Sequence, residues 1–234
     1  MRVLFIGNSH TYFNDMPALF ASMCEELAGT KPEVTMLAYS GRTLEWHCEE
    51  YFSLRFALLY GNYDFCIIQQ RAHPFPEEQE TVSWAERIFA LCGSAGTKPV
   101  VFMPWAQKDE PEMQPVISGI CKRLAQDHDA LLLPAGDMFQ KVRSLYPDIE
   151  LYWEDGGHAS PYGDYLLAAA LAVLLTGKNA PDSLPHTGFD FRCVFEGEDG
   201  YPHAEEELEK VRTALDPLQT GQLLNVVRSF GLKL

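Results

Sequence analysis

A serine stands at a position of the sequence where it could do covalent chemistry. The apolar run 3–6 has the character of a β-strand and stops abruptly at Gly7-Asn8-Ser9, and residues 16–27 then have helical spacing. Ser9 is therefore predicted at the carboxyl end of a first strand and at the mouth of a helix, where open α/β sheets bind ligands. Its hydroxyl can act there as a helix N-cap or as a nucleophile, and Ser9 alone does not decide between the two.

A second group, at residues 155–158, could supply the base that a serine nucleophile needs. Asp155 and His158 are three residues apart, with two glycines between them. Imidazole is the usual base for a serine, and it needs an acceptor on its other nitrogen to fix its tautomer. A turn this short and flexible can fold the carboxylate back onto the histidine. A plain surface turn and a metal site stay open as alternatives, although no third metal ligand has convincing spacing.

Further polar candidates follow the other predicted strands. Because the carboxyl ends of parallel strands lie at one edge of a sheet, residues that follow them converge there. The candidates at this edge are Gly41, Gln69, Gln70, His73, Trp105 and Gln107. Polar groups that converge on an otherwise apolar fold are typical of an active site. Each candidate also has a plainer reading as a turn residue, a strand-end polar residue or a residue that packs at the base of a loop.

The elements that must position these residues alternate between strand and helix. Short apolar runs without polar alternation indicate strands that are covered on both faces, and the alternation predicts right-handed crossovers in a parallel sheet. The predicted strands are 3–6, 34–38, 65–68, 99–103 and 130–133, and the predicted helices are 16–27, 44–59, 81–92, 115–128, 140–145 and 162–175. The sequence thus predicts an α/β protein, a three-layer α/β/α sandwich with a parallel sheet of about five strands.

The carboxyl-terminal part of the chain has a different composition. Residues 181–202 are rich in proline, glycine and aspartate and are predicted to be irregular, and two amphipathic helices are predicted over 204–215 and 218–230. We expect one α/β/α domain over residues 1–180, with residues 181–234 as a loop and helical extension packed on that domain.

Composition excludes several classes of protein. Lys and Arg number 18 against 33 Asp and Glu, so the net charge of −15 repels phosphate backbones, and nucleic acid is not an expected partner. No apolar run is long enough for a helix that spans a membrane, and no signal peptide is expected. A membrane is therefore not an expected partner. The six cysteines lack CxxC spacing, which favours reduced thiols in the cytoplasm. A homo-oligomer is compatible with the sequence but not indicated by it.

On three of these motifs, the sequence resembles the SGNH hydrolases, also called the GDSL esterase/lipase superfamily. Gly7-Asn8-Ser9 is similar to the first block of that family, Gly41 matches the second-block glycine, and Asp155-Gly156-Gly157-His158 matches the last block. The resemblance covers about residues 1–177 and is closest to bacterial members with a Gly-Asn-Ser first block. It implies a flavodoxin-like SGNH fold and a catalytic triad of Ser9, His158 and Asp155, with no cofactor and no metal.

Two departures from the family pattern matter for the chemistry. The first block usually has Asp before the serine, and here the residue is Asn8. The third block normally carries an Asn whose amide completes the oxyanion hole, beside the backbone amides of the serine and the second-block glycine. Strand three ends instead in Gln69-Gln70, so Gln69 is the favoured replacement and Gln70 the alternative, and His73 falls near the position of the family's Asn.

The resemblance therefore implies a serine esterase for small-molecule esters. Small acyl esters, such as acetyl groups on carbohydrates, are the implied substrates, with His73, Trp105 and Gln107 as pocket residues. The main alternative is a non-catalytic, ligand-binding protein with an incomplete oxyanion hole. A flavodoxin-like phosphate binder is a third reading, which the acidic charge and the absence of a glycine-rich loop disfavour.

Overall fold

The computed structural model describes residues 1–185 and 215–234. The chain divides into two compact units, the first made of residues 1–11 and 31–140 and the second of residues 12–30 and 141–234. The predicted helix 204–215 and most of the predicted irregular segment 181–202 lie outside the described residues, as does Cys193. The predicted boundary at residue 180 stays a prediction.

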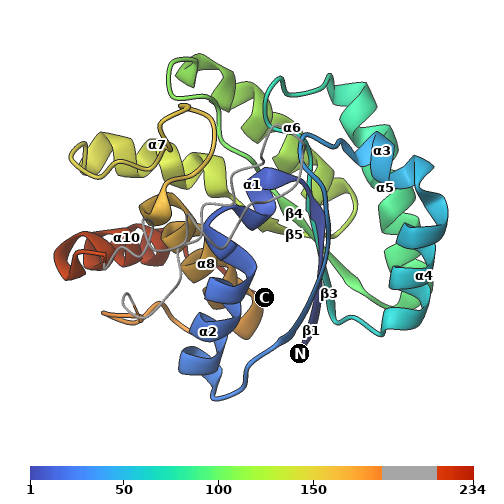
Figure 1. The fold of residues 1–234 in the computed structure, drawn as a ribbon, viewed down its shortest axis with the longest axis horizontal. Helices are drawn as coiled ribbons and strands as arrows, with labels where there is room; N and C mark the ends of the chain where they lie inside the picture. Colours follow the sequence, from blue (N-terminus) through green and yellow to red (C-terminus); the bar gives the residue numbers. More distant parts are fainter. Residues whose placement is uncertain (186–214) are drawn as a thin grey trace, which may run out of the picture. The chain divides into compact units, whose positions relative to one another are not determined.

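The first unit is built around a parallel sheet (Figure 1). Its five strands are β1 (Arg2–Gly7), β2 (Glu33–Ala38), β3 (Phe65–Gln69), β4 (Lys98–Phe102) and β5 (Leu131–Leu133). Each lies within a residue or two of a predicted strand, because a short apolar run is a strong local signal. The prediction that the strands are covered on both faces is wrong for the edge strand β2, in which no residue is fully buried. The register of β1 sets Ile6 opposite Leu37 of β2 on one side and Ile68 of β3 on the other.

The strand order contains a reversal of direction, a topological switch point. The order is β2-β1-β3-β4-β5, so the chain steps from β1 to one side and then reverses past β1 to β3. Helices connected to strands on opposite sides of such a reversal leave a gap beyond the carboxyl ends of the two strands. In this sheet the reversal lies between β1 and β3, which Asn8 and Gln70 follow directly.

Three helices of the first unit pack on one another, and a fourth packs on β4 and β5 (Figure 1). They are α3 (Leu44–Glu49), α4 (Tyr51–Gly61), α5 (Glu78–Ala95) and α6 (Gln114–Asp127), and the 3₁₀ helix η2 (Pro111–Met113) precedes α6. Their apolar faces share one core with Leu4, Ile6 and Ile68 of the sheet. The predicted single helix 44–59 is two helices, because Glu50 leaves helical geometry with ψ of 46°. No proline or glycine marks this break in the sequence.

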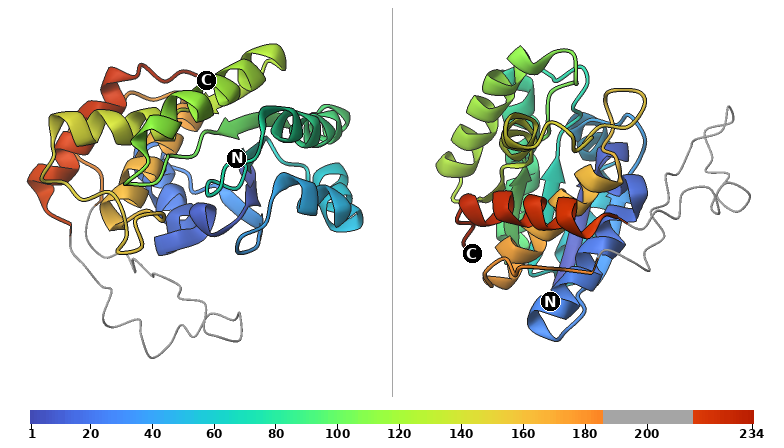
Figure 2. Two further views of the ribbon diagram at one scale, coloured as in Figure 1. Left: turned by 90° about the horizontal axis from the view of Figure 1, so that it is seen from above. Right: turned by 90° about the vertical axis from the view of Figure 1, so that its left-hand side faces the viewer.

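The second unit is helical. Its main elements are α2 (Met16–Ala28), α8 (Pro161–Thr176) and α10 (Pro217–Ser229), preceded by the 3₁₀ helix η1 (Phe13–Asp15). Both α2 and α10 pack against α8, which is buried throughout Gly163–Leu175, and Figure 2 shows α10 alongside α8. Small alanines at 168–170 permit this close approach. No helix in the described ranges is long and apolar enough to cross a membrane.

Two short helices join the units. Helix α1 (Ser9–Tyr12) begins in the first unit, and α7 (Ala135–Leu145) begins there as well and continues into the second. Helix α7 starts five residues before the predicted helix 140–145; Gly136 and Asp137 are weak helix formers, and they hide its first turn in the sequence.

Candidate active site

The turn after β1 is capped by Asn8 and not by the serine. The Oδ1 atom of Asn8 accepts a hydrogen bond from the backbone N–H of His10 at 3.1 Å, and its carbonyl accepts one from Thr11 at 2.9 Å. A side-chain oxygen that accepts from the second helical N–H is the usual N-cap contact. Ser9 follows as the first residue of α1 and is half-buried. The capping role that Ser9 could have taken therefore belongs to Asn8.

The same asparagine ties the turn after β2 to the serine turn. The Nδ2 atom of Asn8 donates to the carbonyl of Arg42 at 3.0 Å, and the N–H of Tyr39 donates to the carbonyl of Gly7 at 3.2 Å. Gly41 lies in this turn with φ of 65°, a conformation that favours glycine. Within the described ranges the Gly41 N–H donates no hydrogen bond. An aspartate at position 8 would lack the donor for Arg42, which gives a physical reason for the departure from the family pattern.

Gln69 is fully buried and its side chain is already engaged. Its Oε1 accepts from the backbone N–H of Asn8 at 3.1 Å and from Thr11 Oγ1 at 2.9 Å, while its Nε2 donates to the carbonyl of Gln70. The side chain therefore fixes the turn between β1 and α1. The favoured prediction, in which the Gln69 amide stabilises an oxyanion, would use the second of its two side-chain N–H groups and stays a prediction.

Gln70 is also buried and serves the backbone around it. Its Oε1 accepts from the N–H groups of Leu44 at 3.1 Å and Arg71 at 2.9 Å, and its Nε2 donates to Thr81 Oγ1 at 3.5 Å. It holds the start of α3 against the loop after β3. Each glutamine thus uses its side-chain oxygen and one of its two side-chain N–H groups within the fold.

Trp105 is a core residue of the first unit, in contrast to its prediction as a pocket residue. It is fully buried and stacks on Phe139 with ring centres 4.4 Å apart and an interplanar angle of 9°. The His10 ring lies between Trp105, at 5.2 Å, and His73, at 5.1 Å. A large apolar ring gains most from complete burial, so Trp105 supports the serine turn from inside through His10.

The other two predicted pocket residues line one pocket of the first unit. It has a volume of about 320 Å³. Its lining residues come from the loops after β3 and β4 and from the start of α6: Ala72, His73, Pro74, Phe75, Ala106, Gln107, Glu110, Met113 and Ile117. Through the contact between His73 and His10, this pocket adjoins the residue that follows Ser9.

In the second unit, Asp155 folds back onto His158 as the spacing predicts. The Nδ1 atom of His158 lies 2.5 Å from Asp155 Oδ2. The other carboxylate oxygen, Oδ1, accepts from the backbone N–H groups of Gly157 at 2.8 Å and His158 at 2.9 Å. Gly156 has φ of 71°, which allows the tight turn. In this geometry the Nδ1–H group of the neutral imidazole donates to the carboxylate. The other ring nitrogen, Nε2, is then the basic one.

The hydrogen bonds to Asp155 also keep it ionised. Partial burial acts to raise the pKa of Asp155, but the His158 ring and the two backbone N–H groups outweigh it and hold the pKa below its ordinary value. An ionised carboxylate at this distance orients the imidazole and stabilises its protonated form.

Residues just after α1 support the histidine. The Phe13 ring stacks on His158 with centres 4.5 Å apart. Asn14, at φ of 51°, donates from Nδ2 to the carbonyl of Ala159 at 2.9 Å and to Asp164 Oδ2 at 2.7 Å. Asn14 thus holds the residues that follow His158, and the side chain of Asp15, directly before α2, makes no capping hydrogen bond.

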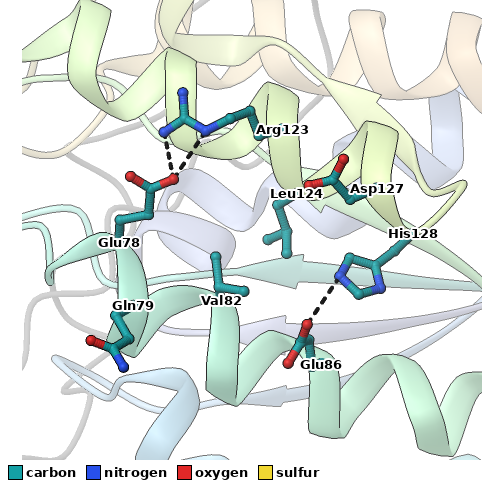
Figure 3. A pocket seen from close by; sticks show the side chains of 8 residues that line it. All are labelled: Glu78, Gln79, Val82, Glu86, Arg123, Leu124, Asp127 and His128. Carbon is teal, nitrogen blue, oxygen red and sulfur yellow. Dashed lines mark hydrogen bonds and ion pairs between the residues drawn. The ribbon is translucent and has the colours of Figure 1, made fainter.

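A second hollow of the first unit contains none of the predicted site residues (Figure 3). It has a volume of about 630 Å³, and α5 and α6 form it together with His128, which follows α6. Arg123 Nε donates to Glu78 Oε1 at 3.0 Å, and His128 Nε2 lies 3.4 Å from Glu86 Oε1. The basic side chains Arg123 and His128 of this hollow thus contact its acidic side chains Glu78 and Glu86, and we do not assign the active site to it.

Comparison with solved structures identifies the fold. An acetylxylan esterase from Geobacillus stearothermophilus is 17% identical, with a TM-score of 0.59 and coverage of 74% of this chain and 92% of that chain. A member of the lipolytic G-D-S-L family from Veillonella parvula is 11% identical, with a TM-score of 0.56 and coverage of 75% and 97%. A lipase/acylhydrolase from Enterococcus faecalis is 17% identical, with a TM-score of 0.56 and coverage of 76% and 96%.

These similarities confirm the predicted fold. The chain has the three-layer α/β/α fold of the SGNH and GDSL esterases and lipases. No family model matches the sequence, and no curated protein matches it. At these identities the likeness concerns the fold alone, so the chemistry must be argued from the residues.

Proposed function

We propose that this protein is a serine esterase that hydrolyses small acyl esters, with Ser9 as nucleophile, His158 as base and Asp155 as the residue that orients the base. The observation that carries the proposal is the 2.5 Å contact between His158 Nδ1 and Asp155 Oδ2. A histidine oriented in this way by an ionised carboxylate is suited to take a proton from a serine hydroxyl. The fold shared with known esterases supports the same class of reaction.

The covalent chain supports the pairing of Ser9 with His158. Phe13, whose ring stacks on His158 at 4.5 Å, is only four residues after Ser9. Four residues span about 6 Å in a helix and at most about 14 Å when fully extended. Helix α1 covers Ser9–Tyr12, so the shorter value applies to most of this segment. The chain thus allows only a short separation between Ser9 and Phe13, the residue that stacks on the proposed base.

The proposed reaction has two steps. Ser9 Oγ attacks the ester carbonyl while His158 Nε2 takes the hydroxyl proton, and the alcohol then leaves with that proton. Water attacks the acyl-serine with His158 again as base, which releases the acid and restores Ser9. Asp155 stays ionised throughout and stabilises the imidazolium.

The backbone N–H groups of Ser9 and Gly41 are the proposed oxyanion donors. Gly41 is favoured because Asn8 ties its turn to the serine turn and because its N–H makes no other hydrogen bond among the described residues. The Gln69 and Gln70 side chains have other partners. An oxyanion hole with two donors is expected to give a kcat about 10²–10³-fold lower than a hole with three donors.

Cysteine is not a competing nucleophile within the described residues. The five cysteines there are free and buried, and burial raises the pKa of Cys24 to about 12 and of Cys48 to about 11. Such thiols carry almost no thiolate at neutral pH. Free buried thiols also fit our inference of a cytoplasmic protein.

Hydrolysis of p-nitrophenyl acetate tests the assignment. Ser9→Ala is expected to lower kcat/KM by about 10³-fold or more. Ser22→Ala is the matched control, since the Ser22 hydroxyl only donates to the carbonyl of Ala18 within α2. A fluorophosphonate probe should label Ser9 in the wild type.

Equal rates in wild type and Ser9→Ala would overturn the proposal. Absence of labelling at Ser9, with a ligand still bound at the edge of the sheet, would favour the alternative of a non-catalytic binding protein. That alternative draws its support from the two engaged glutamines.

A further inference from the structure

The pocket beside His73 differs in character from one that would hold a simple alkyl group. Its volume of about 320 Å³ is at the low end for ligand pockets, which suits one ring-sized group and not a long acyl chain. Apolar atoms of Pro74, Phe75, Met113 and Ile117 line part of it, and His73, Gln107 and Glu110 add polar groups. A lining with both an apolar and a hydrogen-bonding part matches a sugar ring, which has C–H faces and a hydroxyl edge.

The two loops that form this pocket are held by hydrogen bonds. In the loop after β3, Arg71 Nε donates to the carbonyl of Pro74 at 3.2 Å. In the loop after β4, the buried Gln114 accepts from the N–H of Ala106 at 2.8 Å and donates to the carbonyl of Pro104 at 3.3 Å. Backbone bonds from Glu110 to Gln107 and from Met113 to Glu110 order the rim. The pocket is therefore preformed, which lowers the entropic cost of binding.

The pocket adjoins the proposed nucleophile through contacts of the first unit alone. The His73 ring meets the His10 ring at 5.1 Å, and His10 is the residue after Ser9. A group bound there would be the part of an ester that lies next to the reacting carbonyl.

Charge narrows the class of ligand further. Glu110 is the one acidic side chain among the lining residues, and none of them is Lys or Arg. The exposed neighbours Asp109 and Glu112 add negative charge beside one lysine, Lys108. A carboxylate accepts hydrogen bonds from hydroxyl groups and repels anions.

We propose that this pocket binds the alcohol part of the substrate and selects a neutral, polyhydroxylated ring, with Gln107 and Glu110 as the residues that recognise its hydroxyl groups. This inference rests on the proposed esterase function and deepens it. The substrates would be acyl esters of neutral sugars, and esters of anionic sugars would be poor substrates.

The test compares three esters and two variants. The substrates are p-nitrophenyl acetate, a mono-O-acetylated methyl glucoside and a mono-O-acetylated methyl glucuronoside. Gln107→Leu is expected to lower the ratio of kcat/KM for the glucoside over p-nitrophenyl acetate by about 10-fold, because a hydrogen bond to a sugar hydroxyl is lost. Glu110→Gln should lower the preference for the glucoside over the glucuronoside by about 3–10-fold.

A control and a binding measurement keep the outcomes separate. Asp127→Asn removes one negative charge from an exposed position at the end of α6, outside the lining of this pocket, and should leave both ratios unchanged. Binding of methyl glucoside, followed by chemical shifts, should weaken about 10-fold in Gln107→Leu. Hydrolysis in which both variants retain the wild-type ratios would overturn the inference. Binding of the glucoside without any ester hydrolysis would overturn the esterase proposal and leave the pocket assignment standing.

Discussion

The pairing of Asp155 with His158 is a property of single residues and their spacing. The carboxylate contacts its partner three residues away through a turn that Gly156 permits, and its second oxygen is held by two backbone N–H groups. Every contact in this cluster is local. Both oxygens of the Asp155 carboxylate thus accept hydrogen bonds, and these bonds lower the pKa of Asp155.

Replacing this carboxylate tests its role in orienting the base. Asp155→Asn is expected to lower kcat for p-nitrophenyl acetate by about 10²–10⁴-fold, because an amide that donates towards Nδ1 favours the wrong tautomer. Since the pKa of Asp155 is held below its ordinary value, wild-type activity should not fall through protonation of Asp155 until the pH is below the ordinary range of an aspartic acid. The measurements are kcat and its pH profile.

Glu154→Gln is the matched control for this prediction. It removes one negative charge from the exposed neighbouring residue and should change kcat less than about 3-fold. A comparable loss of activity in both variants would mean that the negative charge of the loop matters and that the contact with His158 does not.

At the scale of elements, Gln69 joins the end of β3 to the turn between β1 and α1. Gly7 forms part of the same close approach, since a Cβ there would lie 2.2 Å from Thr11 Oγ1 and 2.7 Å from Gln69 Oε1. Glycine at position 7 is therefore required by packing. The glutamine amide and the glycine together set the position from which α1 starts.

Gln69→Leu should act on stability first. It removes the acceptor of the Asn8 N–H and of the Thr11 hydroxyl, and we expect a loss of about 1–3 kcal/mol in the free energy of unfolding, measured with urea. Gln79→Leu, at an exposed position of α5, should change stability by less than about 0.5 kcal/mol. An unchanged urea midpoint with kcat lowered about 10²–10³-fold would instead assign the Gln69 amide to the oxyanion.

The bounds of most helices could be predicted from the sequence, but a break within a helix could not. The periodicity of apolar residues predicts α2, α5, α6 and α8 within about three residues of their bounds, because one buried face leaves a regular pattern. The break between α3 and α4 at Glu50 leaves none, since the residue is no helix breaker. Tertiary packing decides such a break.

At the scale of the whole molecule, a buried acid affects stability. Asp164 is completely buried in the first turn of α8, and burial raises its pKa well above the ordinary value, against the opposing effect of the Asn14 hydrogen bond. The unfolded chain then loses this proton at lower pH than the folded protein does. The contribution of Asp164 to the free energy of unfolding is therefore fully present below about pH 4. It decreases as the pH rises towards the pKa of Asp164 in the folded protein.

Asp164→Asn should abolish the decrease in stability that Asp164 causes as the pH rises. The amide stays neutral and can still accept from Asn14, so we expect a higher Tm than wild type at pH 7–8, with a difference that shrinks towards pH 4. One kcal/mol corresponds to about 2–4 °C for a chain of this size. Thermal unfolding between pH 4 and 8 measures the difference.

Asp148→Asn, at an exposed position, serves as the control and should follow the wild type at every pH. A Tm difference between Asp164→Asn and wild type that does not change with pH would contradict the assignment of this titration to Asp164.

The sequence by itself determined the parts of this protein that depend on near neighbours. Apolar runs gave the five strands, and the three-residue spacing gave the pairing of Asp155 with His158. Only the tertiary structure decided the roles of Gln69 and Trp105, which pin the serine turn and fill the core. Gln69 meets Asn8 across 61 residues of chain, and Trp105 meets Phe139 across a helix and a strand. The sequence shows that a glutamine amide can donate and accept hydrogen bonds. Strand order and register decide which partners that amide contacts.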